Sequence, residues 1–150
     1  MTSRTIAIRL KIPDNEAYTA LTALRRLGVQ VARLERAEIW AFEDAGSDGD
    51  FVERVERNET LFNPNKHELH VLDEGKPREG EAWIETLRET EERADDLARI
   101  GRPVAGVSAG RRFVGWRLFA DGQTAADAST VHAAVEKLLC NPAIERAIIS

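Results

Sequence analysis

The sequence predicts an α+β fold in which one strand–helix–strand–strand–helix–strand unit occurs twice, the second time in truncated form. Segments with strictly alternating apolar residues, the period of a half-buried strand, are interleaved with segments that have the three-to-four-residue period of a helix. In both halves of the 150-residue chain, a glycine ends one predicted helix and an Asn-Pro pair ends the next. We therefore expect units at residues 1–75 and 76–150 that share one packed core, with antiparallel sheets and helices on the outside.

The first half opens with a predicted strand over 6–12, followed by a helix that Asp14 caps and Gly28 ends. Two further strands are expected at 30–35 and 37–43. The inward face of the first strand carries four alternating apolar residues: Ile6, Ile8, Leu10 and Ile12. The inward face of the helix is expected to carry Tyr18, Leu21, Leu24 and Leu27.

A second helix and a short strand complete the first unit. Ser47 and Asp50 have the spacing of an acidic capping box at its start, and Asn63-Pro64 ends it. A short strand over 67–72 follows. Three apolar residues of this helix are expected to face the core: Phe51, Val55 and Phe62.

The second half is expected to begin directly with a long amphipathic helix over 81–100, which Gly101 ends, so that no strand precedes it. Strands follow at 103–108 and 112–120. This brings the expected total to seven strands and four helices. Five apolar residues of the long helix are expected to point inward: Trp83, Ile84, Leu87, Ala94 and Leu97.

The chain is expected to close with a helix and a strand. Thr124 and Asp127 form a second predicted capping box, and Asn141-Pro142 ends the helix that follows. The inward residues of that helix are Val131, Val135, Leu138 and Leu139. The last strand carries Ile144, Ile148 and Ile149.

Two pairs of sequence matches indicate an internal repeat. Gly28–Ala32 corresponds to Gly101–Ala105, in each case a helix stop before a strand. Leu61–Pro64 corresponds to Leu139–Pro142, in each case a helix end before a strand. Repeated units of this kind each bury a face against the other.

Composition narrows the classes of function. The 21 Lys and Arg residues stand against 26 Asp and Glu, and the net charge of −5 argues against nonspecific nucleic-acid binding. A single cysteine, Cys140, forms no internal disulfide, which is typical of a reducing, cytoplasmic compartment. No apolar run approaches the roughly 20 residues that a membrane span requires.

Motifs for catalysis and metal binding are weak. Gly106–Gly110 matches the Gly-X-Ser-X-Gly pattern of a hydrolase nucleophile elbow around Ser108. However, a strand is expected after it, where the elbow needs a helix. A serine hydrolase is therefore only a remote alternative. His67 and His70 are three residues apart on a predicted strand, so their side chains project from opposite faces. They are therefore not expected to bind one metal ion together. We expect no catalytic residues, no metal and no cofactor.

Positive charge is concentrated near the predicted hairpin of the second half. Salt bridges to the neighbouring acidic helix explain this pattern in the simplest way. The alternative is contact with an anion or a partner, for which Arg102, Arg111 and Arg112 are the candidates. This alternative corresponds to a regulatory module that binds a small anion or nucleotide. The arginines concerned are Arg99, Arg102, Arg111, Arg112 and Arg117.

The end of the chain resembles a known family. Val135–Glu145 reads Val-Glu-Lys-Leu-Leu-Cys-Asn-Pro-Ala-Ile-Glu. It resembles the closing helix and strand of PurS, whose pattern is Glu-Lys-Leu-Leu, then Asn-Pro and an apolar residue before Glu. PurS is the small subunit of phosphoribosylformylglycinamidine synthase in purine biosynthesis. Ala109-Gly110-Arg111 resembles the Gly-Lys turn of that family. Asp14 to Gly28 has the spacing of its first helix, although only Asp14, Leu24, Leu27 and Gly28 match as residues.

The resemblance implies a fold and a role. A PurS subunit is one ferredoxin-like unit that dimerises, so this chain would be two fused units, and a homo-oligomer is expected. PurS is not a catalyst; it bridges the synthetase and glutaminase subunits of its complex. The resemblance thus implies a cytoplasmic, non-catalytic assembly protein or a paralogue of one. Its expected partners are amidotransferase and synthetase subunits (PurL-like and PurQ-like), with no nucleic acid and no membrane.

Overall fold

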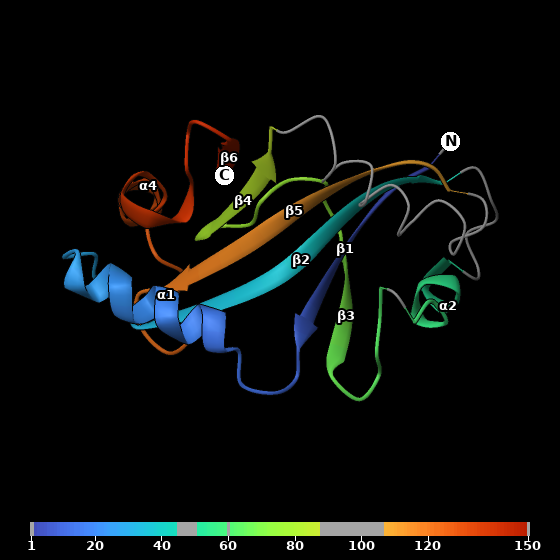
Figure 1. Ribbon diagram of the computed structural model, residues 1–150, viewed down its shortest axis with the longest axis horizontal. Coiled ribbons are helices and arrows are strands. Elements are labelled where there is room, and N and C mark those ends of the chain that lie inside the picture. The colour runs from blue at the N-terminus through green and yellow to red at the C-terminus, as the bar shows by residue number, and fades with distance from the viewer. Residues whose placement is uncertain (1, 45–50, 60, 88–106, 150) are drawn as a thin grey trace. The chain divides into compact units, whose positions relative to one another are not determined.

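The computed structural model describes residues 2–44, 51–59, 61–87 and 107–149 (Figure 1). It confirms the α+β class. None of the helices in these ranges has the length and apolar character that a membrane crossing demands. The elements in chain order are β1 (Thr2–Leu10), α1 (Asn15–Arg26), β2 (Arg33–Asp44), α2 (Phe51–Glu56), β3 (His67–Leu72), β4 (Glu81–Thr86), β5 (Val107–Phe119), α4 (Ala128–Ala134), the π-helix η2 (Val135–Leu139) and β6 (Glu145–Ile149).

The strands belong to one six-stranded sheet with the order β3-β1-β2-β5-β4-β6. In the first half, β1 lies between β2 and β3 (Figure 1) and pairs antiparallel with both. Ile6 of β1 lies opposite Trp40 on one side and Val71 on the other. In the second half, β4 pairs antiparallel with both β5 and β6. The first strand of each half thus lies between the second and third strands of that half.

The chain divides into two compact units that do not coincide with its two halves. Unit 1 comprises the described parts of 1–12, 38–75 and 88–112, and unit 2 comprises those of 13–37, 76–87 and 113–150. Helix α1, from the first half, therefore belongs to the same unit as α4 and η2, from the second. Each unit has its own hydrophobic core.

The core of unit 1 forms where the alternating residues of β1 and β2 meet α2. The rings of Trp40 and Phe42 stack with centroids 5.9 Å apart, and Phe42 meets Phe51 edge to face at 5.5 Å. Contacts of this kind stabilise a core beyond the area that they bury. The buried members are Ile6, Ile8, Trp40, Phe42, Phe51, Val55, Leu61 and Phe62.

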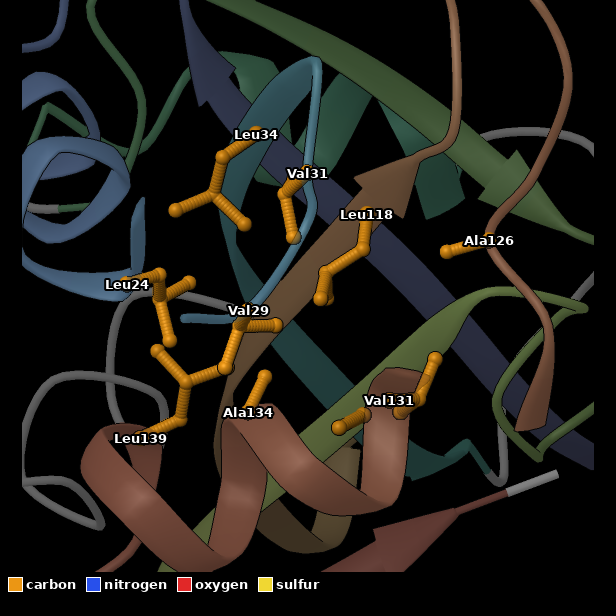
Figure 2. Close-up of a cluster of buried hydrophobic side chains, with 10 residues drawn as sticks. Leu24, Val29, Val31, Leu34, Leu118, Ala126, Val131, Ala134 and Leu139 are labelled. Atoms are coloured by element: carbon orange, nitrogen blue, oxygen red, sulfur yellow. The ribbon is translucent and has the colours of Figure 1, made fainter. Parts of the chain in front are cut away.

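The core of unit 2 forms between α1, the segment after it, β5 and the α4–η2 helix (Figure 2). Asp14 caps α1 as predicted, because its carboxylate accepts hydrogen bonds from the backbone N–H groups of Glu16 and Ala17. Gly28 has φ +86, which confirms the predicted left-handed helix stop. Figure 2 shows the core side chains pointing toward one another: Leu24, Val29, Val31, Leu34, Leu118, Ala126, Val131, Ala134 and Leu139.

The prediction of a helix beginning at residue 81 is wrong, because 81–86 form the strand β4. Trp83 and Ile84 project from opposite faces of the strand, and both are buried. A strand that is buried on both faces lacks the alternation of apolar and polar residues. Its short apolar run therefore fits a helix equally well. The second half therefore has a first strand and is not truncated at that point. The rest of the predicted helix, 88–101, lies outside the described residues.

Two predicted hairpins are also wrong. Residues 33–44 form one continuous strand in place of strands at 30–35 and 37–43, and β5 runs unbroken through Ala109-Gly110-Arg111. Tight hairpin turns need residues with positive φ, and within the described ranges only Gly28 and Gly80 have it. A four-stranded, ferredoxin-like unit is therefore not confirmed. The predicted strand at 103–108 is described only from Val107 onward.

Several boundaries and faces differ from expectation. Strand β1 ends at Leu10, not at residue 12, and α2 ends at Glu56, well before Asn63-Pro64. Asp127 alone caps α4, by accepting from the backbone N–H of Thr130 at 2.8 Å. The predicted cap at Ser47 and Asp50 lies outside the described residues. Five residues assigned to the core are exposed: Ile12, Tyr18, Leu27, Leu87 and Leu138.

Candidate functional site

The arginines singled out from the sequence do not converge in the described structure. Arg111 and Arg112 are consecutive residues of β5, so their side chains leave the strand on opposite faces. The guanidinium of Arg112 lies 3.8 Å from Oε2 of Glu38. Arg102 and Arg99 lie outside the described residues.

The hydrolase motif lacks its required setting. Strand β5 runs from Val107 to Phe119, so no helix begins at Gly110 to position Ser108. On β3, Nδ1 of His67 accepts a hydrogen bond from the backbone, whereas Nε2 of His70 lies 3.5 Å from Glu68. In the part of the chain that the structure describes, no three His, Cys, Asp or Glu side chains are grouped to hold a metal ion.

The first Asn-Pro segment is a tight turn held by four hydrogen bonds. The carbonyl of Asn63 accepts from the N–H groups of Lys66 and His67, at 3.0 and 2.8 Å. The side-chain oxygen of Asn63 accepts from the N–H of Asn65 at 2.9 Å. The N–H of Asn63 in turn donates to Nδ1 of His67 at 3.0 Å. This turn leads directly into β3.

The second Asn-Pro segment, which carries the family resemblance, has the same construction. The carbonyl of Asn141 accepts from the N–H groups of Ile144 and Glu145, at 3.0 and 2.8 Å. Its side-chain oxygen accepts from the N–H of Ala143 at 3.1 Å. Its own N–H donates to Oε1 of Glu145 at 2.9 Å. The conspicuous Asn and Glu of the motif thus have a structural role, because they fold the chain from η2 into β6.

An open, mainly apolar groove of about 440 Å³ lies in unit 2 between α1 and η2. Ala20 and Ala23 of α1 form one wall, and Leu138 and Leu139 of η2 contribute to the lining together with Trp116 of β5. Leu138 is 40 % exposed although it belongs to the apolar stretch that closes the helix. Sequence analysis placed Leu138 in the core because its helical spacing does not tell a core face from an uncovered groove.

A second feature of unit 2 is a group of three arginines, which we call the arginine cluster: Arg33 and Arg117, whose guanidinium groups lie over the ring of Phe119, and Arg78, whose charge acts on Arg117. The guanidinium carbon of Arg33 lies 3.9 Å from the ring centroid of Phe119, and that of Arg117 lies 5.2 Å from it. These are cation–π distances. Sequence analysis considered Arg117 but missed Arg33 and Arg78, since no local pattern links positions so far apart in the chain.

No model of a known protein family matches the chain, and no curated protein sequence matches it. Fold and geometry define an α+β protein with a six-stranded sheet, an open apolar groove and an arginine cluster. These two surface features are the candidate sites, one suited to an apolar partner and the other to an anion.

Proposed function

We propose that this chain is a non-catalytic, PurS-like subunit or paralogue that assembles an amidotransferase and synthetase complex of purine biosynthesis in the cytoplasm. The groove between α1 and η2 is the contact surface in this proposal. Its partner inserts apolar side chains there, because an exposed apolar groove gains free energy when it is covered.

One observation carries the proposal. The segment that resembles PurS, Val135–Glu145, supplies Leu138 and Leu139 to the groove lining, so the most specific part of the resemblance coincides with an exposed apolar surface. The repeated strand pairing and the two matching Asn-Pro turns support the duplication on which the comparison with two fused PurS units depends. We interpret the two halves as divergent ferredoxin-like units, each with its second and third strands merged into one.

The test is co-expression with the synthetase and glutaminase subunits from the same cell, followed by size-exclusion chromatography. We expect the chain to elute with one or both subunits. Leu138→Asp places a charge in the apolar groove and should weaken the association by about tenfold or more, as expected for a central contact residue.

Val71→Asp is the matched control, because Val71 is an apolar residue that is 52 % exposed. It lies on β3 in unit 1, whereas the groove residues belong to unit 2. It should leave the association unchanged. Failure of the wild-type chain to bind either subunit would overturn the assembly role. Equal weakening by both substitutions, or by neither, would overturn the assignment of the groove.

A further inference from the structure

We infer that the arginine cluster in unit 2 binds a phosphate group, either inorganic phosphate or the phosphate of a small metabolite. This site is distinct from the groove and does not depend on the assembly role. The residues that carry it are Arg33 and Arg117, which lie over Phe119, and Arg78, which pairs with Glu81; Arg33 pairs with Glu35.

Arg117 is the central residue of the inferred site. It projects from β5 opposite Glu81 of β4 and lies over the ring of Phe119. Its Nε is buried and has no hydrogen-bond partner. Among the described residues its guanidinium has no hydrogen-bonding acceptor, although a buried N–H donor usually has one. A phosphate oxygen would supply that acceptor.

The two neighbouring carboxylates are already occupied by the other two arginines. Glu81 is almost fully buried; its Oε2 accepts from Nη2 of Arg78 at 3.0 Å and its Oε1 accepts from the backbone N–H of Arg78 at the same distance. Glu35 accepts from Nη1 of Arg33 at 2.7 Å. In the part of the chain that the structure describes, the three guanidinium groups of the cluster therefore face two carboxylates, an excess of one positive charge.

The electrostatics of Arg117 agree with an excess of positive charge. Burial, followed by the charge of Arg78, lowers the pKa of Arg117 from its ordinary value, and Arg33 acts in the same direction. Glu81 and Glu35 oppose this shift without reversing it. A bound anion would relieve the repulsion among these cations, so its binding is coupled to the charge that the cluster leaves uncompensated.

Phosphate is the oxyanion that suits this arrangement. A guanidinium group presents several N–H donors in a planar fork, which binds phosphate oxygens in pairs. The guanidinium groups of Arg33 and Arg117 already lie over the ring of Phe119, so less side-chain freedom is lost when the anion binds. A tetrahedral anion also offers oxygens to more than one guanidinium group, whereas a carboxylate offers only two in one plane.

Isothermal titration of the full chain with inorganic phosphate, at constant ionic strength set with chloride, tests the inference. We expect saturable binding, and we expect Arg117→Gln to weaken it by about tenfold or more, the loss typical of hydrogen bonds to a charged group. Arg117→Lys keeps the charge but not the planar fork and should show an intermediate loss. Far-UV circular dichroism checks that each variant is folded.

Arg57→Gln is the charge-matched control, because Arg57 is a highly exposed residue of unit 1 that pairs only loosely with Glu53, at 3.5 Å. It should change the affinity by less than about twofold, because salt screens the charge of so exposed a side chain. Absence of saturable phosphate binding, equal binding of acetate, or equal effects of Arg57→Gln and Arg117→Gln would overturn the inference. If Arg117→Gln does not fold, the comparison of Arg117→Lys with Arg57→Gln decides in the same way.

Discussion

The backbone N–H of Asn63 donates a hydrogen bond to Nδ1 of His67 at 3.0 Å, and the same bond joins Asn141 to Oε1 of Glu145 at 2.9 Å. In both turns the acceptor is the side chain four residues after the asparagine, at the first residue of a strand. Different chemical groups thus satisfy the same backbone donor at equivalent places in the two halves.

This bond predicts a substitution pair at His67. His67→Leu removes the acceptor of the half-buried Asn63 N–H and should lower the free energy of unfolding by about 0.5–1.5 kcal/mol. His67→Gln retains a side-chain oxygen, as Glu145 does in the second turn, and should recover most of that loss. Urea unfolding measures both. Equal loss in the two variants would show that the ring contact with Phe62 matters more than the hydrogen bond.

Gly80 allows a close backbone approach at the start of β4. It has φ +77, and a Cβ at this position would lie 2.8 Å from the carbonyl oxygen of Leu118. Gly80→Ala should therefore destabilise the chain by more than Gly28→Ala, which incurs only the cost of positive φ, about 1–2 kcal/mol. At Gly122 an added Cβ meets nothing within 4 Å, and Gly122→Ala should be nearly neutral. Thermal unfolding of the three variants checks this order.

The thiol of Cys140 should react slowly with alkylating agents. Burial, followed by the charge of Glu145, raises the pKa of Cys140 above its ordinary value of 9.0. Since the thiolate is the reactive form, alkylation by iodoacetamide should be slow at pH 8 and should accelerate only at more alkaline pH. Glu145→Gln keeps the acceptor for Asn141 but removes the charge, so it should speed the reaction slightly. A native rate equal to that of the urea-unfolded chain would contradict the prediction.

Glu68 links the stability of unit 1 to pH. Its hydrogen bond from Arg9 lowers the pKa of Glu68 below its ordinary value of 4.5. A carboxyl group whose pKa is lowered in the folded state stabilises the fold at pH values above its unfolded pKa. That contribution is lost as the pH falls from 4.5 through the lowered value.

Arg9→Gln should raise the pKa of Glu68 toward 4.5, as measured by NMR titration of its carboxyl carbon. The difference in stability between wild type and variant should be largest at neutral pH and should shrink in acid. If the difference in unfolding free energy between wild type and Arg9→Gln persists unchanged at pH 3, the stabilisation comes from packing of the aliphatic part of Arg9 and not from its charge.

The sequence by itself determined the features that depend on a few neighbouring residues. The Asp14 cap, the left-handed Gly28, the turn at Asn141 and the bounds of β3 at 67–72 are all where local chemistry predicts them. A cap or an Asn-Pro turn is decided by hydrogen bonds within four or five residues, so no distant contact is needed to specify it.

Only the tertiary structure decided what distant residues do together. Residues 81–86 are a strand because β5 and β6 pair with them on both sides, although their apolar run also fits a helix. Leu138 lines an open groove. Arg33 of β2 and Arg117 of β5 meet at the ring of Phe119, and the charge of Arg78, from the segment before β4, acts on Arg117. Burial and charge are properties of the surroundings, and those surroundings come from segments far apart in the chain.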